Sequence, residues 1–292
     1  MKQMTKLRFV ISSVLLYCLS PFLAACSPLS AYNALAPADL GVALTKADIA
    51  YGSHPRQKLD VYGPDRPTGA APVVVVFYGG SWNSGDKTDY GFLGKALASR
   101  GFVAIIADYR LVPEIRFPAF IDDGAAAVAW ASRNAQKFGG DPSKVFLLGH
   151  SAGAYIAAMI ALDKTYLNKF DLSPAMIKGV AALAGPYDFL PLDVDVAKAA
   201  FGQAKYPTAT QPINFASRNA PAMFLATGNA DTTVEPRNTY ALADKLKQAG
   251  ANVVVRSYPD VSHVGILLAL SLPFRHQAPV LDDVSNFIRR TP

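Results

Sequence analysis

Short apolar segments rich in β-branched residues alternate with longer segments of helical periodicity through residues 58–258. Continuous apolar runs, such as residues 72–78 and residues 102–108, are typical of strands that are covered on both faces. One helical pattern begins near Pro236 and stops before Gly250. Proline is favoured near the start of a helix and glycine just past its end, so both residues support this helix. This alternation predicts an α/β fold in which helices cover both faces of a central, mostly parallel sheet.

The same patterns place the individual elements. We expect strands at residues 58–62, 72–78, 102–108, 144–148, 179–184, 222–227 and 252–258. We expect helices at residues 90–100, 118–138, 152–164 and 235–249, with a last amphipathic helix through residues 280–288. The chain shows neither an internal repeat nor a linker-like break after residue 50, which predicts one domain over residues 51–292. Residues 186–220 form a long connection between two strands, so we expect a small cap there.

Composition excludes several other classes of protein. Hydrophobic residues make up 51% of the chain and charged residues 17%, so the chain can bury a core and is not a disordered polymer. Two cysteines exclude a disulfide-rich scaffold and a cysteine-cluster metal site. The net charge of +6 falls to +3 without Lys2, Lys6 and Arg8. We therefore expect no nucleic-acid partner.

The N-terminal segment reads as a targeting signal rather than as part of the fold. A basic start precedes a short, interrupted apolar run over residues 9–25, which is typical of a secretory signal peptide. Residues 23–27 (LAACS) resemble the lipobox of bacterial lipoproteins. That resemblance implies cleavage after residue 25 and diacylglycerol on the thiol of Cys26, and the alternative is plain secretion with an incidental cysteine. We expect residues 1–25 to be the signal peptide and residues 26–50 to be a tether and N-terminal segment. The protein would then be a lipid-anchored lipoprotein of the cell envelope, on the periplasmic side or at the outer membrane.

The sequence Gly-His-Ser-Ala-Gly at residues 149–153 follows an expected strand and precedes an alanine-rich helix. In a tight strand–turn–helix connection, this pattern presents the hydroxyl of Ser151 at the carboxyl edge of the sheet, beside a helix N-terminus. Gly149 and Gly153 suit such a turn because larger side chains would collide with neighbouring backbone. The pattern predicts that Ser151 is a nucleophile, provided that a base lies beside it.

The base can be sought among only four histidines. His150 lies inside the tight turn and should point away from Ser151. His54 lies in a polar stretch before the first expected strand, and His276 lies beyond the last one. His263 follows the final strand, and ligands and reacting groups of such sheets gather at the carboxyl ends of strands. We therefore expect His263 to be the base.

A histidine base needs a carboxylate that fixes its tautomer and stabilises the imidazolium. Asp231 follows the expected strand at residues 222–227 and gives the order Ser, Asp, His along the chain. Asp260 is an alternative because it is close to His263 in sequence, and Glu235 is a second alternative. We favour Asp231.

An oxyanion formed on the reacting carbonyl needs hydrogen-bond donors already in place. The backbone amide of Ala152 is one candidate. The others lie after the expected strand at residues 72–78, where the amides of Gly80 and Ser81 are candidate donors and Gly79 shapes the loop. Without Ser151 nearby, the same residues would indicate only an ordinary glycine turn.

With these motifs in view, residues 57–290 resemble the α/β-hydrolase superfamily, and within it the carboxylesterases of the hormone-sensitive-lipase type. The chain is more similar still to their bacterial relatives, which include feruloyl and acetylxylan esterases. The resemblance rests on the segments LDVY at 59–62, YGGSW at 78–82, DYRL at 108–111, GHSAG at 149–153 and GPYD at 185–188, together with Asp231 and His263. It implies a nucleophile, acid and base at Ser151, Asp231 and His263. It implies oxyanion donors at Gly80, Ser81 and Ala152. The family usually carries histidine where this chain has Tyr78, so the loop must be braced by a different side chain.

Together these features predict a serine carboxylesterase that acts through an acyl-enzyme on a small-molecule ester, with neither a metal nor an organic cofactor. An arylformamidase-like amide hydrolase is an alternative, and a non-catalytic envelope lipoprotein is another. We expect the apolar residues 264–274 either to form a core helix or to line the acyl site. The remaining conspicuous carboxylates should brace loops or cap helices: Asp60, Asp108, Asp122, Asp123 and Asp188.

Overall fold

The computed structural model describes residues 28–67 and 69–292, so the predicted signal peptide and Cys26 lie outside the described residues. The strands are β1 (Val42–Ala50), β2 (Lys58–Pro64), β3 (Ala71–Phe77), β4 (Val103–Ala107), β5 (Gly140–His150), β6 (Ile177–Leu183), β7 (Ala222–Gly228) and β8 (Val253–Tyr258). The α-helices are α2 (Pro28–Leu35), α3 (Gly91–Ser99), α4 (Ala119–Asn134), α5 (Ala152–Leu162), α6 (Lys164–Asn168), α7 (Asp195–Phe201), α8 (Arg237–Gln248), α9 (His263–Leu268) and α10 (Val280–Arg290). Short 3₁₀ turns are η1 (Lys87–Tyr90), η2 (Ala135–Phe138), η3 (Pro174–Met176), η4 (Pro207–Thr210), η5 (Pro212–Phe215) and η6 (Leu272–Phe274).

The strands form one 8-stranded sheet in the order β1-β2-β4-β3-β5-β6-β7-β8. Strand β2 runs antiparallel to both of its neighbours, and all pairs from β4 to β8 are parallel. In the middle of the sheet, Val75 lies opposite Ile105 of β4 and Leu147 of β5. The predicted mostly parallel central sheet is therefore confirmed.

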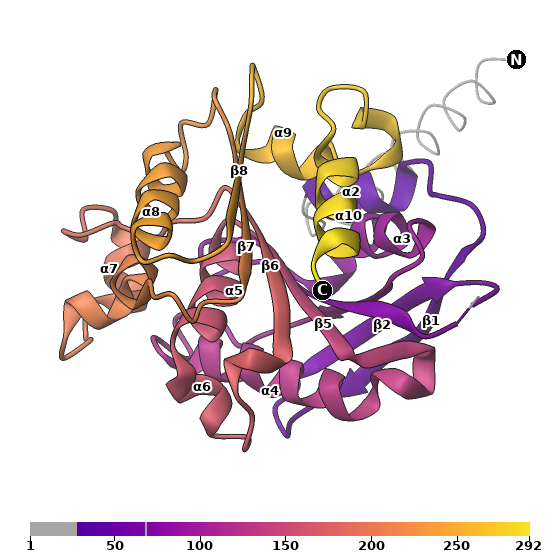
Figure 1. The fold of residues 1–292 in the computed structure, drawn as a ribbon, viewed down its shortest axis with the longest axis horizontal. Helices are drawn as coiled ribbons and strands as arrows, with labels where there is room; N and C mark the ends of the chain where they lie inside the picture. Colours follow the sequence, from indigo (N-terminus) through magenta and orange to yellow (C-terminus); the bar gives the residue numbers. More distant parts are fainter. Residues whose placement is uncertain (1–27, 68) are drawn as a thin grey trace, which may run out of the picture.

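Helices cover both faces of this sheet. Figure 1 shows α3 and α10 together on one side, and α4, α5 and α8 on the other. The middle strands are buried along nearly their whole length, which explains why their sequences are continuously apolar. Ring packing joins the layers: Phe287 of α10 lies against Phe224 of β7, with ring centroids 5.6 Å apart.

The segment that we expected to be a tether is structured where it is described. Strand β1 pairs antiparallel with β2 and extends the sheet. Helix α2 packs beside the C-terminal part of the chain, where the hydroxyl of Tyr32 lies 2.5 Å from that of Ser271. The carboxylate of Asp39 makes two hydrogen bonds with the guanidinium of Arg275, of 2.7 and 2.6 Å. Strand β1 is mostly exposed, so its sequence carries no pattern of burial that would have identified it.

The long connection between β6 and β7 is the predicted cap region, and it carries α7, η4 and η5. In Figure 1, α7 lies on the same side of the sheet as α8. Within the part of the chain that the structure describes, no helix is both long and apolar enough to cross a lipid bilayer.

Candidate active site

Ser151 lies in a sharp turn between the end of β5 and the start of α5. Its φ of 55° and ψ of −123° are unusual for a residue with a side chain, and its backbone N–H donates a hydrogen bond of 2.9 Å to the carbonyl of Leu183. A Cβ atom on Gly153 would lie 2.0 Å from the carbonyl oxygen of Phe77, so only glycine fits there. The turn therefore holds the serine hydroxyl at the carboxyl edge of the sheet, as the sequence predicted.

Three side chains from distant parts of the sequence meet at this edge. His263 Nε2 lies 2.9 Å from Ser151 Oγ, and His263 Nδ1 lies 2.7 Å from Asp231 Oδ2. An ionised carboxylate only accepts hydrogen bonds, so Nδ1 carries the hydrogen and Nε2 is free to accept the serine proton. The structure thus brings together the three residues that the sequence singled out.

Asp231 is held as a carboxylate in a buried position, with 3% of its surface exposed. Burial opposes its charge. The hydrogen bond from His263 favours the charged form, and so do the backbone amides of Val234 and Thr233, whose nitrogens each lie 2.9 Å from Oδ1. Together these hydrogen bonds outweigh the effect of burial, so the pKa of Asp231 lies below its ordinary value. Asp231 is therefore charged at neutral pH and can stabilise a positive His263.

The two alternative carboxylates lie elsewhere. Asp260 is exposed, and Glu235 pairs with Arg237 at 2.9 Å. Among the described residues, neither carboxylate forms a hydrogen bond with His263. The geometry therefore selects Asp231 as the partner of the histidine.

The loop after β3 places candidate oxyanion donors beside Ser151. Ser81 and Ala152 line the same cavity as Ser151. Ala152 opens α5, where the first amides of a helix lack internal partners, and no described protein group accepts a hydrogen bond from the amide of Gly80 or Ser81. Ser81 has a φ of 51°, a strained value that is often found where a loop serves a site. The amide of Gly79 instead donates to Tyr90 Oη at 2.9 Å, so Gly79 shapes the loop.

The cavity around Ser151 has a volume of about 450 Å³. Its lining combines apolar side chains, including Trp82 and Phe189, with polar ones from the turn after β7, including Thr232 and Thr233. The cap region contributes residues on both sides of the α7 N-terminus: Asp193, Val194, Val196 and Ala197. A reacting group at Ser151 would therefore meet both apolar and polar side chains.

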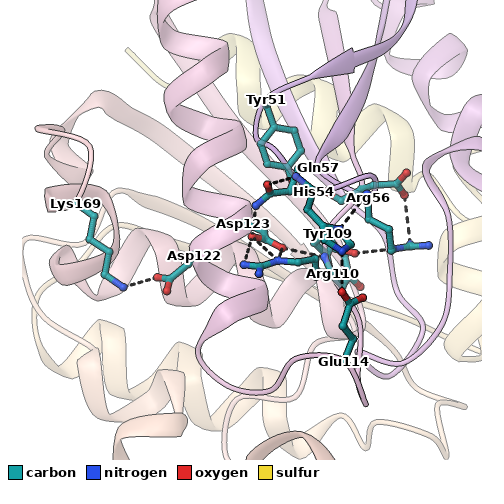
Figure 2. Close-up of polar contacts among 11 residues, drawn as sticks. Tyr51, His54, Arg56, Gln57, Tyr109, Arg110, Glu114, Asp122, Asp123 and Lys169 are labelled. Carbon is teal, nitrogen blue, oxygen red and sulfur yellow. Dashed lines mark hydrogen bonds and ion pairs between the residues drawn. The ribbon is translucent and has the colours of Figure 1, made fainter.

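Tyr78, which stands where the family usually has histidine, is braced by a residue that sequence reasoning missed. Arg56 Nη2 donates to Tyr78 Oη and to the carbonyl of Gly85, at 2.7 Å in each case. Tyr109 stacks on Tyr78 at 4.6 Å between centroids and donates from its hydroxyl to the carbonyl of Tyr78 at 2.9 Å. Arg56 Nε also donates to the carbonyl of Tyr109, as Figure 2 shows. Tyr109 belongs to the DYRL segment that carries the resemblance, but Arg56 lies outside every quoted motif, so no pattern in the sequence indicated its contact with Tyr78.

Several of the carboxylates that we expected to brace loops or cap helices hold neighbouring segments together. Figure 2 shows Asp123, which is buried and accepts hydrogen bonds from Arg110 and Gln57. Asp122 pairs with Lys169 at 2.5 Å. Asp60 pairs with Lys87, and Asp108 accepts a hydrogen bond from the amide of Lys87. At Asp188, it is the backbone amide that donates, to Asn238 Oδ1.

The three other histidines of the chain lie in different surroundings from His263. His54 contacts Glu114 at 2.7 Å, and His276 is exposed. His150 is buried and points away from Ser151, as predicted.

Residues 264–274 form most of α9 and then η6, and none of them lines the cavity around Ser151. Its buried side chains belong to the hydrophobic core, which favours the core-helix alternative for this segment.

The chain is similar to several known proteins. The BD-FAE family model matches residues 59–246. Among curated proteins, the chain is 29% identical over 242 residues to a probable isoprenylcysteine alpha-carbonyl methylesterase of Oryza sativa, which covers 75% of this chain and 57% of that protein. It is 30% identical over 225 residues to esterase LipC of Mycobacterium tuberculosis, which covers 70% of this chain and 56% of that protein. The chain thus spans a little over half the length of these relatives.

Solved structures show the same fold. Esterase B from Lactobacillus rhamnosis superposes with a TM-score of 0.79 at 19% identity, over 95% of this chain and 96% of that one. A carbohydrate esterase from gut microbiota superposes with a TM-score of 0.76 at 21% identity, over 88% of this chain and 99% of that one.

Proposed function

The chain belongs to the BD-FAE family, and from this membership and the geometry of its site we propose that it is a serine hydrolase of carboxylic esters. The observation that carries the proposal is the continuous line of hydrogen bonds from Ser151 through His263 to Asp231. The names of the relatives, which include several esterases, support the same reaction.

In the first half of the reaction, Ser151 Oγ attacks the ester carbonyl carbon while His263 Nε2 accepts the hydroxyl proton. The carbonyl oxygen becomes an oxyanion, which the amides of Gly80, Ser81 and Ala152 would hold. Collapse of this intermediate breaks the bond to the alcohol oxygen. His263 then gives its proton to that oxygen, the alcohol leaves, and the acyl group stays on Ser151.

In the second half, a water molecule attacks the acyl carbon and His263 takes one of its protons. The intermediate collapses, the acid leaves, and the proton returns to Ser151 Oγ. Asp231 stays ionised throughout and stabilises the imidazolium of His263 in both halves. This account uses only side chains and amides of the protein.

The lining of the cavity supports a substrate with a compact apolar part and an oxygen-rich part. Trp82 and Phe189 offer aromatic surface, and Thr232 and Thr233 offer hydroxyl groups. A volume of about 450 Å³ suits a small ester better than a long acyl chain.

The test is a panel of substrates presented to the full chain and to Ser151→Ala. The panel contains p-nitrophenyl esters of short and long acids, an acetylated sugar, a feruloyl ester and a formanilide. We expect short esters to be hydrolysed by the wild type and left intact by the variant. Preferential cleavage of the formanilide would instead favour an arylformamidase-like activity, and hydrolysis that persists in Ser151→Ala would contradict the proposal.

We also propose, from the sequence alone, that the protein is anchored in the cell envelope by lipid on Cys26. The test is metabolic labelling with a fatty-acid analogue in a bacterial host. Label should enter the wild type and be absent from Cys26→Ala, and equal labelling of the two would contradict the anchor.

A further inference from the structure

A chain of buried hydrogen bonds runs behind the site and joins its separate parts. The amide of Gly79 donates to Tyr90 Oη at 2.9 Å, and Tyr90 Oη lies 3.3 Å from His150 Nδ1. On the other side of the ring, His150 Nε2 lies 2.9 Å from the backbone carbonyl oxygen of His263. We propose that Tyr90 and His150 are positioning residues, which hold the oxyanion loop and the backbone of His263 in register with Ser151.

The direction of each hydrogen bond follows from the chemistry of the groups. The carbonyl of His263 can only accept, so His150 Nε2 carries the hydrogen. A neutral imidazole then has an acceptor at Nδ1, so the hydroxyl of Tyr90 donates to it. The oxygen of Tyr90 is thereby left to accept from the amide of Gly79. Each hydrogen bond therefore has one direction, because the other neutral tautomer of His150 would place two acceptors, Nε2 and the carbonyl oxygen of His263, against each other.

Burial keeps the ring of His150 in its neutral form. Tyr90 is 3% exposed and His150 is 4% exposed. Burial, followed by the charge of nearby His263, lowers the pKa of His150 to about 3, so its ring stays neutral at neutral pH. The two imidazole rings lie 4.8 Å apart between centroids. A neutral His150 therefore fixes the neighbouring backbone without adding a positive charge beside the imidazolium that forms on His263.

This chain of hydrogen bonds can affect the reaction through Gly79, which lies beside both the candidate oxyanion donors and Ser151. Gly79 immediately precedes the candidate donors Gly80 and Ser81, and a Cβ atom on Gly79 would lie 3.0 Å from His150 Nδ1 and 3.1 Å from Ser151 Cβ. The loop thus lies directly on the turn that holds the nucleophile. If Gly79 is not held by Tyr90, the amides that follow it can shift away from the oxyanion.

Four variants separate the parts of this chain. Tyr90→Phe removes the hydroxyl and both of its hydrogen bonds. His150→Asn keeps an acceptor near the position of Nδ1, whereas His150→Gln keeps a donor near Nε2 and loses that acceptor. Tyr166→Phe is the matched control, since Tyr166 is a buried tyrosine of α6 that does not line the cavity.

The measurement compares kcat/KM for p-nitrophenyl acetate with kcat/KM for the analogue in which sulfur replaces the carbonyl oxygen. Sulfur accepts hydrogen bonds weakly, so the ratio of the two values reports how well the oxyanion donors are placed. We expect the ratio to fall about 10-fold in Tyr90→Phe, mainly through kcat for the oxygen ester, because removing an oxyanion donor outright costs about 10²–10³ in rate. The ratio should fall more in His150→Gln than in His150→Asn, and it should not change in Tyr166→Phe.

This inference rests on the proposed esterase function, and the same experiment distinguishes the two. A folded wild type that leaves p-nitrophenyl acetate intact would overturn the esterase function and, with it, the role of the chain in catalysis. An active wild type whose ratio is unchanged in Tyr90→Phe and His150→Gln would overturn the positioning role alone. A lower melting temperature with an unchanged ratio would assign Tyr90 to stability only, and would overturn it as well.

Discussion

Asp231 Oδ2 lies 2.7 Å from His263 Nδ1, although the two residues follow different strands of the sheet. This contact fixes which nitrogen of the imidazole faces Ser151. It also places a buried negative charge where His263 becomes positive during the proposed reaction. The order of strands β7 and β8, side by side at one edge of the sheet, brings the two residues together.

Replacing Asp231 with asparagine should therefore lower kcat for a short ester by about 10³–10⁴-fold, because the amide can favour the wrong tautomer of His263 and cannot stabilise its charge. The measurement is steady-state hydrolysis of p-nitrophenyl acetate. Asp260→Asn is the matched control, because this exposed carboxylate was the alternative partner of His263 in the sequence analysis. Loss of activity in Asp260→Asn with retention in Asp231→Asn would reverse the assignment.

Gly153→Ala should destabilise the protein by about 3 kcal/mol or more, because the new Cβ would lie 2.0 Å from backbone at the end of β3. Gly250→Ala is a useful comparison: the φ of Gly250 is +83°, but nothing lies within 4 Å of the added atom. We expect it to cost about 1 kcal/mol, through backbone strain alone. Urea unfolding measures both, and equal losses would contradict the close approach at Gly153.

The buried His150 predicts a pH dependence of stability. Its pKa is lowered from 6.5 to about 3 in the folded protein, so the unfolded chain binds a proton that the folded one does not. The free energy of unfolding should therefore fall as the pH drops from 6.5 towards 3, by roughly 1 kcal/mol per pH unit from this residue. The lowered pKa of Asp231 acts in the same direction, but only below its ordinary value of 3.8.

Denaturant unfolding at several pH values checks this effect. The stability of His150→Asn should change less between pH 6.5 and pH 4 than that of the wild type. His276→Asn, which alters an exposed side chain, serves as the control. Parallel curves for the wild type and His150→Asn would show that His150 does not cause the loss.

The contact between Asp39 and Arg275 should hold the N-terminal segment against the end of the chain. The two side chains are 10% and 21% exposed and share two short hydrogen bonds. Asp39→Ala should lower the free energy of unfolding by about 1–3 kcal/mol, because a partly buried guanidinium loses its partner. Asp195→Ala, which breaks an exposed pair with Lys198, should have almost no effect. Equal stability of Asp39→Ala and the wild type would contradict this role.

The sequence predicted the central strands well because they are buried on both faces. Strand β4 is an example: each of its residues is buried, and its sequence is continuously apolar. Strand β1 lies at the edge with mostly exposed side chains, and neither burial nor periodicity distinguished it from a tether. Pairing with β2 forms this strand, and pairing between distant segments leaves no local signal.

The same distinction applies to the site. Ser151, Asp231 and His263, which we propose to take part in the reaction, each come after the end of a strand and within a recognisable motif. They could therefore be chosen from the sequence. The residues that hold them in place could not. Tyr90 lies 60 residues from His150, and Arg56 lies 22 residues from Tyr78, so only the folded chain brings each pair together.

The central claim is that the hydroxyl of Ser151, activated by His263, is a nucleophile. The most direct measurement is reaction of the full chain with a fluorophosphonate, followed by mass spectrometry of the peptide that contains Ser151. We predict one phosphonyl group on Ser151 of the wild type and much slower labelling of His263→Ala. A folded, unmodified wild type, or a phosphonyl group on another residue, would contradict the account.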